Sequence, residues 1–176
     1  IDLRKGPVEL GTVIAVAVET VQPLIEAARQ HLTLTQPSEP MWLEADPVRL
    51  GQVFGNLLNN ATKYTGIGGE IQILVEPRDG MAHVRVRDTG VGISQELLPH
   101  VFELFRQGAP DHSRGRSGLG IGLSLVKRLT RLHGGRVEAL SLGPGQGSEF
   151  RVQLPLLAEP PAEPPSALPG SPMLSS

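Results

Sequence analysis

Apolar residues between positions 46 and 65 recur with the spacing of one helix face. They stand at i, i+3, i+4, i+7, i+8 and i+11, the pattern of an amphipathic helix on a core: Leu50, Val53, Phe54, Leu57, Leu58 and Ala61. Asp46 and Pro47 form a typical helix start, because the carboxylate accepts free N–H groups and proline has none to satisfy. The other face carries three amides that are poor helix formers: Asn56, Asn59 and Asn60. Helix stability does not explain these amides. This face of the helix could be simply solvated or could have a function, and the segment alone does not decide between the two.

Three further segments have helical spacing. Residues 11–30 place five apolar side chains near one face: Val13, Ala17, Val21, Leu24 and Ala28. Pro23 inside this segment predicts a kink or a break near residues 21–22. Ser94 is a candidate cap for a second helix, which carries Leu97, Leu98, Val101, Phe102 and Phe105. A third helix is predicted from Gly118, and its inward residues are Ile121, Leu125, Leu129 and Leu132.

Alternating apolar and polar residues predict β-strands elsewhere in the chain. The candidates are residues 7–10, 32–35, 41–44, 70–76, 82–88, 137–140 and 149–154. Asp79-Gly80 indicates a hairpin turn between the two longest strands. The same alternation puts Asp88 on the inward face with the valines, where a carboxylate is costly unless it has a donor. The donor could be a nearby backbone N–H group or the N–H group of a ligand, and the sequence does not decide between them.

Two glycine-rich segments stand where a backbone turns tightly or approaches a ligand. The first is Asp88-Thr89-Gly90-Val91-Gly92-Ile93, and the second is Gly118-Leu119-Gly120-Ile121-Gly122-Leu123. The second opens a predicted helix, where free N–H groups favour a phosphate, although close packing on a neighbouring helix explains glycines there nearly as well. It matches neither the dinucleotide fingerprint nor the P-loop. Residues 106–117 between the two segments are almost entirely polar, which indicates a mobile lid.

Composition narrows the classes of function. The 176 residues suffice for one domain with a core, and a net charge of −2 gives no sign of a basic nucleic-acid-binding face. The absence of cysteine excludes disulfides and thiolate metal sites, and the five histidines are too scattered to predict a zinc site. No uninterrupted apolar run approaches ~18 residues. Because the chain starts at Ile1 without methionine, we expect a piece of a longer protein, and the Pro-rich residues 157–176 predict a disordered tail or a linker.

Five short motifs occur in a fixed order along residues 1–156. They are Asn56-Leu57-Leu58-Asn59-Asn60-Ala61, Asp88-Thr89-Gly90-Val91-Gly92, Phe102-Glu103-Leu104-Phe105, Gly118-Leu119-Gly120-Ile121-Gly122-Leu123 and Gly145-Gln146-Gly147-Ser148-Glu149-Phe150. The series resembles the N, G1, F, G2 and G3 boxes of the catalytic and ATP-binding domain of sensor histidine kinases, within the superfamily shared with gyrase, Hsp90 and MutL. The resemblance implies an α+β fold, a two-layer α/β sandwich (the Bergerat ATP-binding fold) whose mixed, mainly antiparallel sheet packs against helices.

The resemblance also implies roles for individual residues around ATP and Mg²⁺. Asp88 would accept the adenine amino group, with Gly90, Gly92 and Ile93 on the adenine side and Ser148 near the G3 end. Asn60 would be the metal ligand, and Lys63 and Tyr64 would reach the phosphates. The backbone of Gly118, Leu119, Gly120, Ile121, Gly122 and Leu123 would cradle the β- and γ-phosphates, and Arg106 would touch the nucleotide. Asn59 is expected to be a solvated residue.

Asn56 stands where the ATP-hydrolysing relatives carry a glutamate that activates water. An amide is no base at neutral pH, so Asn56 points away from hydrolysis and, with Lys63, toward catalysis of phosphoryl transfer. The acceptor in this family is a histidine on a preceding dimerisation domain, and none of the five histidines here has its His-Glu/Asp-x-x-x-Pro setting. We therefore expect a kinase fragment that cannot autophosphorylate alone.

The expected partners follow from the same resemblance. They are ATP, the dimerisation domain of the same polypeptide and a downstream response regulator receiver domain; no nucleic acid and no direct membrane contact are expected. The fragment is expected to be monomeric and cytoplasmic, and the sequence leaves a membrane anchor in the parent open. A nucleotide-binding regulatory module without kinase activity and an ATPase of the wider superfamily are the alternatives.

Overall fold

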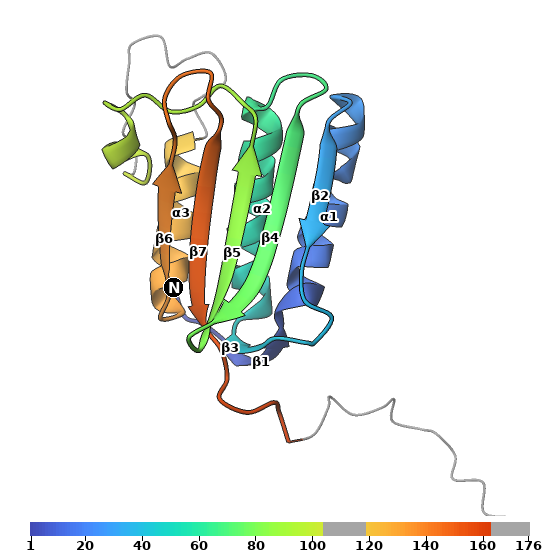
Figure 1. Ribbon diagram of the computed structural model, residues 1–176. Helices are drawn as coiled ribbons and strands as arrows, with labels where there is room; N and C mark the ends of the chain where they lie inside the picture. The colour runs from blue at the N-terminus through green and yellow to red at the C-terminus, as the bar shows by residue number, and fades with distance from the viewer. Residues whose placement is uncertain (104–118, 163–176) are drawn as a thin grey trace, which may run out of the picture.

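Three helices pack on one face of a five-stranded sheet (Figure 1). The structure is a computed structural model that describes residues 1–103 and 119–162. Across the sheet the strand order is β2 (His31–Thr35), β4 (Glu70–Arg78), β5 (Met81–Asp88), β7 (Ser148–Pro155) and β6 (Arg136–Leu140). Only β2 and β4 pair in parallel among these neighbours, and the other pairs are antiparallel. The predicted α+β sandwich with a mixed, mainly antiparallel sheet is confirmed.

The helix predicted from the apolar stripe is α2 (Pro47–Tyr64), and it lies at the centre of the helical layer. All six stripe residues are buried, at 2% exposure or less. Asp46 caps the helix as predicted, because its Oδ1 accepts hydrogen bonds from the N–H groups of Val48 and Arg49 at 3.0 and 3.2 Å. The cap and the stripe together fix the start of the helix and the face that it turns to the sheet.

The helix α1 (Leu10–Ala27) runs through Pro23 without the predicted break. Pro23 is exposed, whereas Val21 and Ile25 on either side are buried at 2% and 3% exposure. Packing of this face on α2 thus holds the helix across the hydrogen bond that proline removes. The predicted inward face was also partly wrong: Leu24 is 48% exposed and Ile25 takes its place, because Ile25 stands four residues after Val21.

By length and composition, α1 is the one described helix that could cross a membrane, with a mean hydropathy of 1.4 over 18 residues. A third of that window is buried inside the domain. The face that packs against α2 supplies part of this apolar character, and Val16 and Leu24 are 56% and 48% exposed.

The helix α3 (Leu119–Leu132) packs on α2 through a face one step away from the predicted one. Leu123, Val126 and Leu129 are buried at 1% exposure or less. Among the predicted inward residues whose side chains the structure describes, Leu129 is fully buried, Leu125 is half-buried and Leu132 is 39% exposed. A spacing of three residues therefore fits this short interface better than the predicted spacing of four.

The predicted helix after Ser94 is only a 3₁₀ turn, η1 (Leu98–His100), in the described part of this segment. Ser94 does not cap η1, which has no side-chain cap; its hydroxyl accepts the N–H of Leu97 at 3.2 Å in the turn just before η1. Pro99 lies within the turn and has no N–H to extend a helical ladder. Beyond it, Phe102 packs edge-on against Phe150 with 6.0 Å between the ring centroids, so side-chain packing rather than a helix holds this segment.

The predicted hairpin and the short strands are confirmed with small shifts at their ends. Asp79 and Gly80 have φ values of 54° and 75°, the left-handed pair that a two-residue hairpin turn requires. Near the N-terminus, β1 (Gly6–Glu9) pairs antiparallel with β3 (Trp42–Ala45) in a separate two-stranded sheet. This small sheet leads directly into the Asp46 cap of α2.

The segments before β1 and after β7 lie at the end of the sandwich that holds β1 and β3, opposite the loops that follow β5 (Figure 1). The N–H of Arg4 donates to Asp46 Oδ2 at 2.9 Å, and the N–H of Leu157 donates to the Trp42 carbonyl at 2.8 Å. Asp46 is also tied to α3, because its own N–H donates to His133 Nε2 at 3.1 Å. The strand β3 and the Asp46 cap thus connect Arg4 and Leu157 with the helix α2 and with the end of α3.

We predict that Asp46→Asn lowers the melting temperature at neutral pH and has no effect in strong acid. Hydrogen bonds from the N–H groups of Arg4 and Arg49 hold the pKa of Asp46 below its ordinary value of 3.8. A carboxyl group with a lowered pKa stabilises the folded state above the unfolded pKa, and this stabilisation is lost as the pH falls through the folded pKa. The difference in melting temperature, measured by circular dichroism, should be full above pH ~5 and should shrink below it. A difference that does not change with pH would contradict this prediction.

Candidate functional site

A pocket lies between α2, α3, β7 and the segment that follows β5. Its wall is mostly apolar and is formed by Asn60, Tyr64, Val91, Gly92, Ile93, Leu97, Val101, Leu123, Ser148 and Phe150. Apolar walls with a few polar groups are typical of sites for small organic ligands. The sequence-predicted residues that line it are Asn60, Tyr64, Gly92, Ile93, Leu123 and Ser148.

Asp88, 9% exposed, lies at the edge of this pocket, where Ser148 connects it to the wall. Its Oδ1 accepts the N–H of Gly90 at 2.8 Å and the N–H of Ser148 at 3.2 Å, and its Oδ2 accepts the Ser148 hydroxyl at 2.7 Å. Nearby backbone N–H groups therefore satisfy the carboxylate, as one of the two open alternatives expected. A carboxylate accepts about four hydrogen bonds, so Oδ2 keeps one acceptor position for a ligand.

The segment after β5 passes close to the end of α2. The N–H of Val91 donates to the Tyr64 carbonyl at 3.1 Å. A Cβ atom on Gly90 would stand 2.3 Å from the same carbonyl oxygen, so only glycine fits there. The position of Tyr64 in the pocket wall is thus fixed by direct backbone contact with the segment that carries Asp88.

The three asparagines of α2 have three different environments. Asn60 is half-buried and lines the pocket, and Asn59 is exposed as expected. Asn56 Nδ2 donates to the carbonyl oxygen of Gly122 in α3 at 3.3 Å. Asn56 therefore connects the two helices, and Asn60 is the amide that a ligand in the pocket would meet.

Lys63 lies apart from the pocket wall. Its side chain is exposed, and Nζ lies 5.8 Å from the centroid of the Tyr64 ring. Lys63 is not a lining residue, and the structure relates it to the pocket only through the Tyr64 ring.

Several predicted residues fall outside the described part of the chain. They are Arg106 and Gly118, with the lid segment 106–117. Leu119, Gly120 and Ile121 are described only as the first backbone turn of α3, while Gly122 lies beside Asn56 and Leu123 lines the pocket.

Sequence reasoning missed four residues of the wall: Val91, Leu97, Val101 and Phe150. The sequence analysis placed each of them in a glycine-rich turn, a helix or a strand. An apolar residue in such an element is usually a core residue, so none of the four was predicted as part of a site. The signal that identifies them is three-dimensional, because they surround a space that the core does not fill.

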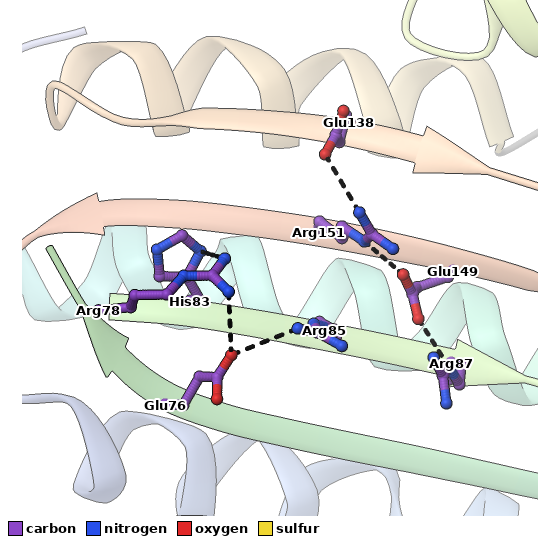
Figure 2. A network of polar contacts seen from close by, with 8 residues as sticks. All are labelled: Glu76, Arg78, His83, Arg85, Arg87, Glu138, Glu149 and Arg151. Atoms are coloured by element: carbon purple, nitrogen blue, oxygen red, sulfur yellow. Dashed lines mark hydrogen bonds and ion pairs between the residues drawn. The ribbon is translucent and has the colours of Figure 1, made fainter. Parts of the chain in front are cut away.

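A network of ion pairs lies on the face of the sheet away from the helices (Figure 2). Glu149 accepts hydrogen bonds from Arg87 Nε at 2.6 Å and from Arg151 Nε, and Arg151 also pairs with Glu138 at 3.9 Å. Arg87 stands opposite Glu149 in the β5–β7 register, one position from the Asp88–Ser148 pair. Burial alone would raise the pKa of Glu149, but the hydrogen bonds from Arg151 and Arg87 lower it below its ordinary value of 4.5.

Comparison with known proteins identifies the type of site. Residues 45–158 match the family described as "Histidine kinase-, DNA gyrase B-, and HSP90-like ATPase". The chain belongs to this family. The matched range runs from the Asp46 cap past the last strand and contains every described lining residue of the pocket.

Relatives and solved structures agree with the histidine kinase branch. The chain is 33% identical over 160 residues to hybrid signal transduction histidine kinase D of Dictyostelium discoideum, covering 88% of this chain and 10% of that protein. It resembles the catalytic domain of the histidine kinase ThkA with a TM-score of 0.75 at 25% identity, over 87% of this chain and 96% of that one. Full-length ShkA, solved in complex with AMPPNP, gives a TM-score of 0.73 at 28% identity, over 89% of this chain and 32% of that one.

These matches make the chain a catalytic, ATP-binding domain of the sensor histidine kinase type. The chain spans only 10% to 33% of the length of the first five curated relatives it matches. The domain is thus one part of such proteins.

We predict that Glu149→Gln lowers stability more than Glu138→Gln, its matched control on the same face. Glu149 is shared by two arginines and its side chain is 9% exposed, whereas Glu138 is 45% exposed and makes one long ion pair. Because the arginine partners are exposed, the expected loss is about 1 kcal/mol, a few degrees in melting temperature. The difference in melting temperature should be full above pH 4.5, the ordinary pKa of glutamate. It should disappear as the pH falls through the lower pKa that Glu149 has in the folded state. Equal melting temperatures for the two variants at neutral pH would contradict this prediction.

Proposed function

We propose that this domain binds ATP with Mg²⁺ and transfers the γ-phosphate to a histidine on a dimerisation domain outside this chain. The observation that carries the proposal is the Asp88 carboxylate, which three protein donors hold at the edge of an apolar pocket with one acceptor position left. That position suits a ligand that brings both a flat apolar ring and an N–H donor.

Adenine is such a ligand. Its amino group would donate to Asp88 Oδ2, and its ring would lie against the wall formed by Val91, Ile93 and Phe150. The Ser148 hydroxyl already donates to Oδ2 at 2.7 Å, which fixes the direction of the remaining lone pair. Gly90 and Gly92 let this segment lie directly against the Tyr64 and Gly143 carbonyls, which holds its backbone beside the pocket.

Asn60 is the protein ligand that we propose for Mg²⁺. No group of three or more His, Cys, Asp and Glu side chains in residues 1–103 and 119–162 could hold a metal ion. A single neutral amide in the pocket wall fits an ion whose other ligands are phosphate oxygens and water. Bound Mg²⁺ would neutralise phosphate charge, and Lys63, next to the lining residue Tyr64, would add a positive charge.

The first turn of α3 is the proposed site for the β- and γ-phosphates. The N-terminal N–H groups of a helix and its positive dipole end favour anions, and Leu123 already brings α3 into the pocket wall. Gly118 and Arg106 remain proposed contacts from outside the described residues.

Asn56 supports transfer over hydrolysis. Its amide donates to Gly122, and an amide cannot take a proton from water at neutral pH. Phosphoryl transfer depends mostly on positioning and charge neutralisation, and neutral imidazole is already nucleophilic. By bonding α3, Asn56 would hold the phosphate-binding turn in place rather than activate a nucleophile.

The proposed partners extend beyond this chain. The domain would act on the dimerisation domain of its own polypeptide, and the segment 157–176 would link it to a response regulator receiver domain. Full-length ShkA, part of which has this fold, is in complex with AMPPNP, which supports the proposal that this domain binds a nucleotide. We also propose that the domain lies in the cytoplasm, because ATP and the response regulators of this family are found there.

We predict that Asp88→Asn weakens ADP binding by about 10- to 100-fold, the value of a hydrogen bond to a charged group. The new amide oxygen can still accept from Gly90 and Ser148, and the new NH₂ group can donate to the Ser148 hydroxyl, so the fold should survive. The position that faced the ligand would donate instead of accept. Calorimetry measures the affinity, and Asp79→Asn in the distant hairpin turn is the matched control. Unchanged ADP affinity in Asp88→Asn would show that the adenine assignment is wrong.

The phosphotransfer proposal is tested with the chain, a separately produced histidine-bearing dimerisation domain of the parent and γ-labelled ATP. We expect Mg²⁺-dependent, acid-labile label on the dimerisation domain, none on this chain alone, and strong loss of label with Asn60→Ala.

Two other outcomes would favour the alternatives. ATP binding without transfer to the dimerisation domain or release of phosphate would indicate a regulatory module. Release of phosphate to water in the absence of the acceptor, at a rate comparable to transfer, would indicate an ATPase and would overturn the role given to Asn56.

A further inference from the structure

We infer that Ser141, just after β6, is a positioning residue of the nucleotide site. Its side chain does not line the pocket, and it belongs to none of the five motifs. It acts through the segment 90–93 after β5, whose residues Val91, Gly92 and Ile93 form part of the wall. The inference rests on the proposed function, because it assigns Ser141 a role in the same pocket.

The Ser141 hydroxyl uses all of its hydrogen-bonding capacity. It donates to the Gly147 carbonyl at 2.7 Å, and its oxygen accepts the N–H of Ile93 at 3.0 Å and the N–H of Gly143 at 3.2 Å. A hydroxyl has one donor and two acceptor lone pairs, so each of them has a partner. One small side chain thereby joins the segment after β5 to both ends of the turn between β6 and β7.

The other connections between these two segments are backbone hydrogen bonds. The N–H of Gly145 donates to the Val91 carbonyl at 2.7 Å, and the N–H of Gly147 donates to the Gly90 carbonyl at 3.1 Å. Ser141 adds the third connection, at Ile93, and it is the one that depends on a side chain. Without it, the described structure offers the Ile93 N–H no acceptor.

The two segments are in direct backbone contact at Gly92. A Cβ atom on Gly92 would stand 2.1 Å from the Gly143 carbonyl oxygen. Gly143 in turn donates its N–H to Ser141, so the hydroxyl fixes the group against which Gly92 rests. A change at Ser141 would therefore move the wall at Gly92 and Ile93.

The same turn leads into the Asp88 contact. Gly147, which accepts the Ser141 hydroxyl, directly precedes Ser148, whose N–H and hydroxyl hold Asp88. Ser141 thus acts on both sides of the adenine position: on the apolar wall through Ile93 and on the carboxylate through Gly147 and Ser148.

The test compares Ser141→Ala, Ser141→Thr and the wild-type chain in MgATP affinity, measured by calorimetry, and in amide hydrogen exchange at Ile93. We expect Ser141→Ala to weaken MgATP binding by about 5- to 10-fold, the range of one lost hydrogen bond, and to speed exchange at Ile93. Exchange at Val86 in the core of β5 should not change. Ser141→Thr keeps the hydroxyl and should restore both quantities.

Thr130→Val is the matched control, because it removes a buried hydroxyl that donates to the Val126 carbonyl inside α3. It should lower the melting temperature and leave both MgATP affinity and Ile93 exchange unchanged. If Ser141→Ala does not fold, Ser141→Cys, with a weaker donor and acceptor of similar size, replaces it in both measurements.

Wild-type affinity for MgATP in Ser141→Ala, with unchanged exchange at Ile93, would overturn the inference and leave the proposed function standing. Failure of the wild-type chain to bind MgATP would overturn the proposed function instead. In that case faster exchange at Ile93 without nucleotide would still support Ser141 as the residue that fixes this segment, and unchanged exchange would refute it.

Discussion

Asp88 ends the central strand β5 with a carboxylate that is 9% exposed, and the site depends on the donors that make this burial possible. Two of the three come from Ser148 on the neighbouring strand β7, so the β5–β7 register has to be correct before the carboxylate is satisfied. The third comes from Gly90, where a side chain would collide with the end of α2. A strand end, a turn and a helix end are therefore fixed around one charged group.

The helix α2 joins this arrangement to the core. Its buried stripe packs on the sheet and on both other helices, which sets the rotation of the helix about its axis. That rotation decides which asparagine meets the pocket: Asn60 lines it, Asn59 is exposed and Asn56 bonds α3. Burial of the apolar stripe of α2 thus sets the position of its three asparagines. The asparagines do not have to stabilise the helix, because the packing of the stripe does so.

Sequence patterns predicted the elements more reliably than the faces of the helices. The stripe of α2, the alternation in β4 and β5 and the Asp79-Gly80 turn were all confirmed, since each reflects a local period or a local backbone requirement. Pro23 did not break α1, because packing on both sides outweighs one lost hydrogen bond. The helix expected after Ser94 is a single 3₁₀ turn, because side-chain packing of Phe102 holds that segment instead.

By itself the sequence determined the order of the elements, the buried position of Asp88 and the family, because periodicity, turn residues and motif order are written along the chain. Only the tertiary structure decided which groups satisfy Asp88, which apolar residues enclose the pocket and that Ser141 holds its wall. Ser148 lies 60 residues from Asp88, and Ser141 lies 48 residues from Ile93. Contacts at such separations are set by strand register and helix packing, to which no local pattern in the sequence corresponds.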